Sequence, residues 1–245
     1  MSEAVLILGA TSAIARATAN AFAARGDALY LASRDDDELR RIAADIRLRY
    51  GVEVYHGLFD AEVTATHEAF FKSVIAAMPE LSGMVLAFGY LGDQRAARDF
   101  SVGAKVIASN FTGAVSILSQ CANYLELLQR GFIIGISSVA GDRGRQSNYV
   151  YGAAKGALSL YLQGLRNRLH PGGVRVITVK PGFVDTAMTY GLPGMVLVAS
   201  PQYIGECIVR ALGRSADIVY LPWFWRYIML IIKLIPEPVF KRLKL

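Results

Sequence analysis

Short apolar runs alternate with amphipathic segments along almost the whole chain. Continuous apolar runs bounded by turn residues are typical of strands that are buried on both faces of a parallel sheet. The expected strands are Ala4–Leu8, Ala28–Ala32, Val52–Leu58, Gly83–Phe88, Gly131–Ser137, Val174–Lys180 and Ile218–Leu221. Helical patterns lie between them, the longest from Asp99 to Gln129 and another from Tyr149 to Leu169. This alternation predicts an α/β fold with a doubly wound, Rossmann-like parallel sheet of about seven strands and helices on both faces.

The first strand leads into a turn that could bind phosphate. Ala4–Leu8 is followed by the segment Gly9–Ala15 and then by a helical pattern from Arg16 to Arg25. In this order, backbone N–H groups at the helix N-terminus can surround a phosphate, and Thr11 and Ser12 add hydroxyl groups and a helix cap. A plain strand-to-helix turn remains the alternative, because Gly9 is the only glycine of this turn.

A tyrosine, a lysine and a serine form the second candidate site. Tyr151 and Lys155 are four residues apart, so a helix would place them on one face, and Ser138 precedes the tyrosine at the end of an expected strand. A neighbouring ammonium favours the phenolate and is expected to lower the pKa of Tyr151, so that the phenol can exchange a proton with a substrate oxygen. Ser138 could hold the same oxygen. An ordinary helix with a buried tyrosine is the alternative for the Tyr–Lys pair alone.

Together these residues resemble the short-chain dehydrogenase/reductase family. Asn110 within Ser109–Gly113 and the segment Pro181–Thr186 also match family motifs, and the resemblance runs from Val5 to Leu221. It implies an oxidoreductase that reduces a carbonyl group with a nicotinamide cofactor. The catalytic residues that it implies are Asn110, Ser138, Tyr151 and Lys155. In the family, the asparagine fixes a water of a proton relay, and the lysine holds the cofactor ribose.

The resemblance also implies where the cofactor would bind. The expected cofactor-binding residues are Gly9, Thr11, Ser12, Ala13, Ile14, Ser33, Arg34, Asp60, Ala87, Phe88, Gly89, Tyr151, Lys155, Pro181, Gly182, Val184 and Thr186. Two departures from the family pattern affect this region. Ala13 and Ala15 replace glycines of the first turn, and Ala87–Gly92 stands where the family has Asn-Asn-Ala-Gly. We expect binding to survive with Ala13, in a weakened form. The departures leave a non-catalytic, cofactor-binding regulatory module as an alternative, which the complete catalytic set argues against.

The residues after the second strand indicate the choice of cofactor. An enzyme that selects NAD usually has an acidic residue there for the ribose 2′-hydroxyl. This chain has Ser33 and Arg34, which suit a 2′-phosphate through charge-assisted hydrogen bonds. The acidic residues Asp35–Asp37 are expected to start a helix, although Arg34 could also pair with one of them. We therefore predict NADP(H).

Within the family, three segments resemble the reductases that act on decaprenylphosphoryl keto-pentoses. The segments are Ala87–Asp93, Ser137–Arg143 and the end of the chain, from Trp225 to Leu243. The resemblance implies reduction of the 2-keto group of a polyprenyl-phosphoryl pentose. Arg143 and Arg145 could then hold a substrate phosphate, or they could be solvated loop charges. A reductase of another lipid or acyl ketone remains an alternative.

The C-terminal segment suggests contact with a membrane or with a second subunit. We divide the chain into a catalytic, cofactor-binding part, 1–222, and an amphipathic tail of the same domain, 223–245. The tail is aromatic and aliphatic, and its five basic side chains against the single acid Glu237 supply four of the six net positive charges of the chain. Such a segment is too short and too interrupted to span a bilayer, but it could lie at an anionic membrane surface. Packing at a subunit interface is equally compatible, and the family resemblance implies a homo-oligomer.

Composition narrows the remaining choices. A chain of 245 residues with 53% hydrophobic and 19% charged residues suits one globular domain. Its two cysteines and the absence of a secretory pattern favour a reducing compartment, so we expect a cytoplasmic protein or one at the membrane surface. The histidines are scattered, so we expect no metal site. The predicted catalytic part has no basic stripe, and we expect no nucleic-acid partner. We expect Phe183–Ser200 to be a substrate lid, with an ordinary surface loop as the alternative.

Overall fold

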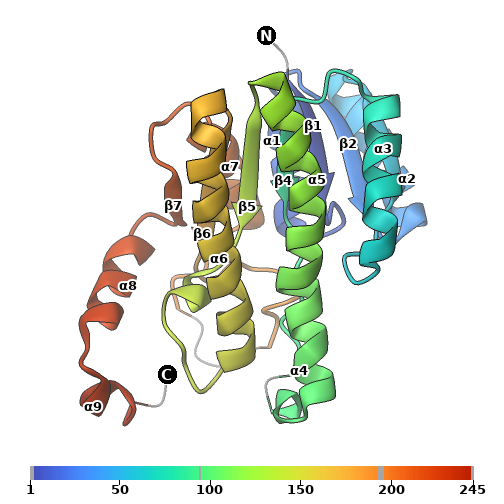
Figure 1. The fold of residues 1–245 in the computed structure, drawn as a ribbon. Helices are drawn as coiled ribbons and strands as arrows, with labels where there is room; N and C mark the ends of the chain where they lie inside the picture. The colour runs from blue at the N-terminus through green and yellow to red at the C-terminus, as the bar shows by residue number, and fades with distance from the viewer. Residues whose placement is uncertain (1–2, 94, 192–195, 244–245) are drawn as a thin grey trace.

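A parallel sheet forms the centre of the molecule. The computed structural model describes residues 3–93, 95–191 and 196–243. Within them, seven parallel strands pair in the order β3-β2-β1-β4-β5-β6-β7 (Figure 1). The strands are β1 (Ala4–Leu8), β2 (Ala28–Ser33), β3 (Val54–Leu58), β4 (Gly83–Leu86), β5 (Phe132–Ile136), β6 (Arg175–Pro181) and β7 (Ile218–Leu221). This confirms the predicted fold class, and the order reverses between β1 and β4, where open α/β sheets bind ligands.

Helices cover both faces of the sheet and create two separate cores. One face carries α1 (Ala13–Ala23), α2 (Asp36–Tyr50) and α7 (Pro201–Ala211), and the other carries α3 (His67–Ala77), α5 (Gly113–Leu128) and α6 (Tyr149–Leu169). Strand β1 shows why its sequence is apolar throughout. Val5 and Ile7 enter the first core, whereas Leu6 and Leu8 enter the second. Because successive side chains of a strand point to opposite faces, a strand that is buried on both faces needs an apolar residue at every position.

The longest predicted helix is interrupted by a wider turn. Helix α4 (Phe100–Ile107) passes into a π-helical turn at Ala108–Thr112 and then into α5. By length and apolarity, Phe100–Leu128 could span a membrane. In this fold α5 covers the sheet, because Ile117, Leu118 and Leu125 are buried in the second core. The π-helical turn lies at Asn110, and π-turns inside helices frequently mark functional positions.

The C-terminal tail folds into two short helices beside the sheet. They are α8 (Trp225–Leu234) and α9 (Glu237–Phe240), and they lie beside the loop that follows β5 (Figure 1). Trp225 and Met229 face inward and are buried, at 5% and 0% exposure. We call the opposite side the outer face of α8. It consists of Trp223, Tyr227, Leu230, Ile231 and Leu234, all exposed.

Candidate active site and cofactor cavity

A cavity of about 220 Å³ lies at the carboxyl edge of β1, β2 and β4. Its walls contain these predicted cofactor residues: Gly9, Thr11, Ser12, Ser33, Arg34, Asp60, Ala87, Phe88 and Gly89. Further lining residues are Phe59, Ala61, Glu62, Tyr90, Lys105, Ser109 and Met188. The fold therefore gathers segments that are far apart in sequence at one edge of the sheet, as the topology requires.

The turn after β1 is built to approach the strand next to it. Gly9 has φ of +80°, and a Cβ there would lie 2.8 Å from the Phe88 backbone. Only glycine tolerates both conditions. Ser12 caps α1 by accepting a hydrogen bond from the Ala15 N–H at 3.4 Å, as the sequence predicted. Ala13 and Ile14 form the first turn of α1, and Ala15 is buried within it. The N-terminus of α1 thus borders the cavity and fits a phosphate.

The end of β2 supplies a cation to the same cavity. The Ser33 hydroxyl lies 2.8 Å from the Thr11 hydroxyl, which ties β2 to the first turn. Asp35 caps α2 through the Glu38 N–H at 2.9 Å, and Asp36 pairs with Arg40 at 2.5 Å. In the described parts of the chain, no acidic side chain forms an ion pair with Arg34. Its exposed guanidinium is therefore available to an anion at the cavity wall.

Asp60 is held by contacts on both sides. Its carboxylate accepts a hydrogen bond from the Glu62 N–H at 2.9 Å, and its carbonyl accepts one from His67 Nε2, also at 2.9 Å. His67 is buried, and its Nδ1 lies 2.9 Å from the Ser116 hydroxyl. His67, the first residue of α3, therefore holds the turn that contains Asp60 in the wall of the cavity.

Helix α6 presents Tyr151 and Lys155 on one face in its first turns. Both are buried, at 9% and 3% exposure, and the Lys155 Nζ lies 5.9 Å from the centre of the Tyr151 ring. Ser138 begins the helical turn Val139–Asp142, and its hydroxyl accepts a hydrogen bond from the Ala140 N–H at 3.1 Å. A side-chain hydrogen bond also joins Ser138 to Tyr151. The serine, the tyrosine and the lysine thus meet as the sequence predicted.

Burial shifts the pKa values of Tyr151 and Lys155 in opposite directions. It raises the pKa of Tyr151 to about 12, and the hydrogen bond from Ser138 acts against that rise. It lowers the pKa of Lys155 to about 8. The expected lowering of the tyrosine pKa is therefore wrong, because burial is the largest influence on the phenol. The Lys155 ammonium donates its hydrogen bond to the Ile136 carbonyl, at 3.1 Å.

Asn110 anchors the segment that replaces the family's Asn-Asn-Ala-Gly. It is buried in the π-helical turn, and its amide donates to the Tyr90 carbonyl at 2.6 Å and to the Val106 carbonyl at 2.8 Å. Its side-chain oxygen accepts from the Tyr90 N–H at 3.2 Å. At Gly89, a Cβ would lie 2.8 Å from Asn110 Oδ1 and 3.2 Å from Lys155 Nζ. The absence of a side chain at Gly89 therefore lets the cavity wall contact Asn110 and Lys155, two of the predicted catalytic residues.

The segment after β6 closes the other side of the site. Pro181 ends β6, and the Gly182 N–H donates to the Leu221 carbonyl at 2.9 Å. Val184 pairs with Ala199 in an isolated bridge, and Thr186 Oγ1 lies 3.2 Å from Thr189 Oγ1. Between them, Met188 reaches the cavity. The expected lid, Phe183–Ser200, is thus tied together at its ends, and its residues 192–195 lie outside the described part of the chain.

Comparison with known proteins identifies the family. The model of the short chain dehydrogenase family matches residues 3–194. The chain belongs to the short-chain dehydrogenase family. An uncharacterized oxidoreductase of Mycobacterium tuberculosis is 35% identical over 240 residues, which cover 98% of this chain and 96% of the relative. One of Streptomyces coelicolor is 36% identical over 245 residues, covering 98% and 95%.

Solved structures of the family share this fold. A short chain dehydrogenase from Burkholderia cenocepacia in complex with NADP superimposes with a TM-score of 0.83 at 20% identity, and the match covers 98% of this chain and 97% of that one. In the described residues of this short-chain dehydrogenase, no group of three potential metal ligands comes together.

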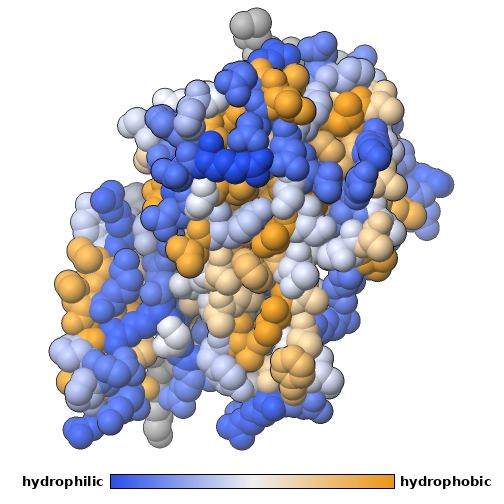
Figure 2. Space-filling model, viewed as in Figure 1, coloured by the Kyte–Doolittle hydropathy of each residue, from blue (hydrophilic) through white to orange (hydrophobic). Residues whose placement is uncertain are grey.

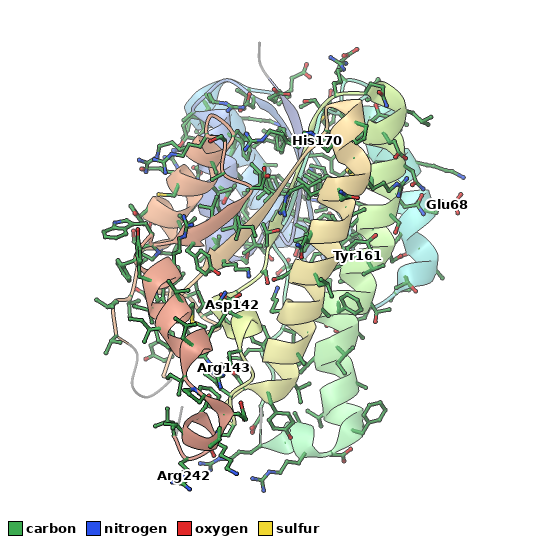
Figure 3. All side chains as sticks on the ribbon, turned by 60° about the vertical axis from the view of Figure 1, so that its left-hand side comes forward. Glu68, Asp142, Arg143, Tyr161, His170 and Arg242 are labelled. Carbon is green, nitrogen blue, oxygen red and sulfur yellow. The ribbon has the colours of Figure 1, made fainter. Side chains whose placement is uncertain are left out.

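The sequence allows two roles for Arg143, a contact to a substrate phosphate and a solvated loop charge. In the structure of this short-chain dehydrogenase its contacts differ from both. It neither lines the cavity nor projects into solvent. Instead its guanidinium donates to the Ile232 and Ile235 carbonyls at 2.6 Å each and pairs with Glu237 at 3.0 Å, so it points to the tail (Figure 3). Arg145 is partly buried, its Nε has no hydrogen-bond partner within the described chain, and burial lowers its pKa.

Sequence reasoning also missed two supporting groups. The Ser137 hydroxyl bonds to the Lys155 carbonyl at 2.8 Å and to the Ser159 hydroxyl at 2.7 Å, which fixes the strand end to α6. Asp142 accepts hydrogen bonds from Lys180 and from the Tyr220 hydroxyl. The doublet Ser137–Ser138 was a visible signal, but nothing in the sequence spacing indicates the contact between Asp142 and Lys180.

Proposed function

We propose that this short-chain dehydrogenase is an NADPH-dependent carbonyl reductase. The single observation that carries the proposal is the convergence of Ser138, Tyr151, Lys155 and Asn110 beside the cavity at the carboxyl edge of the sheet. A scaffold that only bound a dinucleotide would need none of the serine and tyrosine hydroxyls at this position. The Mycobacterium tuberculosis and Streptomyces coelicolor relatives, which match the chain over nearly its full length, are both named uncharacterized oxidoreductases.

The residues divide the work of protonating a ketone oxygen. NADPH, when bound, supplies the hydride that reaches the carbonyl carbon. Tyr151 donates its proton to the oxygen, and its raised pKa keeps that proton in place at neutral pH. The Ser138 hydroxyl, which is hydrogen-bonded to Tyr151, would hold the same oxygen. Lys155 would bind the cofactor ribose, and Asn110 holds the segment around Gly89 and Tyr90 through its hydrogen bonds to Tyr90.

The preference for NADP(H) is supported by the cavity wall. Arg34 stands at the end of β2 with no acidic partner in the described chain, next to Ser33. A guanidinium and hydroxyl groups suit a ribose phosphate, whereas an acid there would repel it. The solved Burkholderia cenocepacia structure with the same fold holds NADP.

The substrate that we propose is a lipid-linked ketone, such as the 2-keto group of a polyprenyl-phosphoryl pentose, reduced at a membrane surface. Support comes from the outer face of α8, on which three aliphatic and two aromatic side chains are exposed, and from the basic residues of the tail. Hydrophobic and hydrophilic residues lie side by side in this part of the surface (Figure 2). Apolar helix faces flanked by cations bind anionic lipid surfaces. The predicted lid also exposes the side chains of Met188 and Tyr190, and Met188 lines the cavity. We also propose that the protein forms a homo-oligomer.

A direct assay tests the reaction. The purified protein is incubated with NADPH that carries deuterium at C4 and with ketones ranging from small soluble compounds to lipid extracts. Mass spectrometry of the alcohol then shows whether the label reached the former carbonyl carbon. Labelled alcohol is the expected result, and cofactor binding without any turnover across the panel would leave a binding module as the better description.

A further inference from the structure

The turn that carries Ser138 is attached to the tail by an arginine. Besides its bonds to Ile232, Ile235 and Glu237, Arg143 donates to the Lys233 carbonyl at 3.2 Å. Its guanidinium lies 3.7 Å from the centre of the Phe240 ring, and its side chain is 14% exposed. Carbonyls at a helix C-terminus lack partners within the helix and carry partial negative charge. Arg143 thus satisfies the end of α8 with one guanidinium.

The start of α8 contacts the other active-site segment. Trp225 packs with Val139, the residue after Ser138, and its ring lies 5.6 Å from that of Phe183. A Cβ on Gly182 would be 1.9 Å from Trp225 Nε1, so the indole lies directly against this residue. In the described chain the buried Nε1 has no hydrogen-bond partner, so packing holds the ring. Trp225 therefore fills the space between the Ser138 turn and the segment after β6.

A buried ion pair joins the same two segments a second time. Asp142 lies at the end of the Ser138 turn, and Lys180 immediately precedes Pro181. Their side chains form an ion pair with exposures of 2% and 11%, and the Tyr220 hydroxyl donates to Asp142 at 2.7 Å. The turn is thus held by β6 and β7 at Asp142 and by the tail at Arg143 (Figure 3).

We propose that Arg143 is a positioning residue for Ser138. By anchoring the Ser138 turn to α8 and α9, it fixes the serine hydroxyl relative to Tyr151, so the tail belongs to the active-site structure. This inference rests on the proposed reductase function for its kinetic consequences. Displacement of a reacting group by about 1 Å can cost on the order of a hundredfold in rate. Loss of the anchor should therefore reduce turnover while the cofactor cavity, whose lining does not include Arg143, keeps its affinity.

Three variants separate this role from general stability. Arg143→Met removes the guanidinium, and Arg143→Lys keeps the charge without its planar fork. Arg130→Met is the matched control, since Arg130 is a surface arginine outside the tail, with 62% of its side chain exposed. For Arg143→Met, we expect turnover to fall by about tenfold to a hundredfold with the Kd for NADPH unchanged. Arg143→Lys should lie between it and the parent, because an ammonium cannot reach several carbonyls at once. Normal turnover in a folded Arg143→Met, or equal losses of turnover and NADPH binding, would overturn the proposal.

A double-mutant cycle tests whether Arg143 acts through Ser138. If it does, Arg143→Met should cost little further turnover in a Ser138→Ala background. Additive losses in the double variant contradict the inference. Amide hydrogen exchange provides a readout that needs no substrate: residues 138–143 should exchange faster in Arg143→Met and Arg143→Lys but not in Arg130→Met. If residues 138–143 exchange at the parent rate in the Arg143 variants, the proposed anchoring by Arg143 is wrong, whether or not a ketone substrate is found. If they exchange faster but the parent protein reduces no ketone, only the proposed reaction is refuted.

Discussion

The Nζ of Lys155 lies 5.9 Å from the centre of the Tyr151 ring and donates its hydrogen bond to the Ile136 carbonyl. The two side chains therefore share a buried face of α6, with the ammonium over the phenol ring at the outer range of a cation–π contact. Burial penalises the charged form of each group, so the phenol holds its proton more tightly and the ammonium gives up its proton more easily. Neighbouring groups whose pKa values are shifted in opposite directions are typical of acid–base sites. In the proposed reduction of a ketone, a tyrosine that remains protonated at neutral pH would serve as the proton donor.

Replacing Tyr151 by phenylalanine should remove that proton donor and leave the packing around it intact. We expect Tyr151→Phe to bind NADPH normally and to lose at least about a hundredfold in turnover, the lower range for a general acid. Tyr149→Phe is the matched control, because Tyr149 lies in the same helical turn and is 44% exposed. Steady-state kinetics together with fluorescence titration of NADPH measures both quantities. Near-normal turnover of Tyr151→Phe would rule out its role as the acid.

The buried ammonium predicts a dependence of stability on pH. Burial lowers the pKa of Lys155 from 10.5 to about 8. Between these values the unfolded chain binds the proton more often than the folded one, so the free energy of unfolding should rise with pH. From pH 8 to 10 this contribution is about 2 kcal/mol, at about 1.4 kcal/mol per pKa unit. Below pH 8 both states are charged and the full cost of burial is present.

Urea unfolding at a series of pH values checks this prediction. The difference between the parent and Lys155→Met isolates the contribution of Lys155, since all other groups titrate in both proteins. Lys72→Met serves as the control, because Lys72 is exposed and pairs with Glu68 on the surface of α3. Parallel curves for the parent and Lys155→Met from pH 8 to 10 would show that the lysine is not desolvated.

The sequence predicted the elements whose pattern is set by the sheet itself. Strand β1 must be apolar at each position because both of its faces are buried, and the same reason makes β5 and β6 recognisable. Strand ends were less certain: the predicted Val52–Leu58 begins at Val54, and Gly83–Phe88 ends at Leu86. The π-helical turn in the predicted helix Asp99 to Gln129 has no signal in the apolar periodicity, because it only widens the helix locally.

In the candidate site, too, some features could be predicted from the sequence and others could not. Ser12 and Asp35 were expected to cap or start helices from their residue types alone, and the structure confirms both. The role of Arg143 could not be predicted, because its partners are backbone carbonyls about ninety residues later in the chain. Every residue has a carbonyl, so no sequence pattern marks these acceptors. The direction of the Tyr151 pKa was missed because its burial depends on the packing of Val106 and Ala140 around the ring.

The cofactor preference can be tested at Arg34. Arg34→Asp should weaken NADPH by at least about tenfold relative to NADH, because a charge-assisted hydrogen bond is worth about 1.5–3 kcal/mol and the new carboxylate repels a phosphate. Arg214→Asp, an exposed substitution after α7, controls for the change in net charge. Isothermal titration gives both affinities. If the parent already binds NADH and NADPH equally well, the assignment of Arg34 to the 2′-phosphate is wrong.

Deleting the tail is a poor test of membrane binding, because Trp225 and Arg143 connect it to the active-site segments. The outer face of α8 offers a cleaner one. Ile231 and Leu234 are exposed at 65% and 72%, so polar residues there should not disturb the inner contacts of Trp225 and Met229. The helix also carries Arg226 and Lys233, and the cationic residues Lys241 and Arg242 follow it.

We predict that the parent protein floats with vesicles that contain anionic lipids and is released by moderate salt, because screening weakens the attraction of the basic side chains. The double substitution Ile231→Ser and Leu234→Ser should abolish flotation, since apolar burial at the interface is lost. Leu48→Ser with Leu127→Ser is the matched control, because these leucines are exposed at 87% and 85% on α2 and α5. Reduction of a small soluble ketone should persist in both double variants, whereas reduction of a lipid-linked ketone in vesicles should fall only in the first. Light scattering distinguishes the competing role: if the parent stays in solution and the first variant has a smaller mass, the outer face of α8 is a subunit contact and the membrane proposal fails.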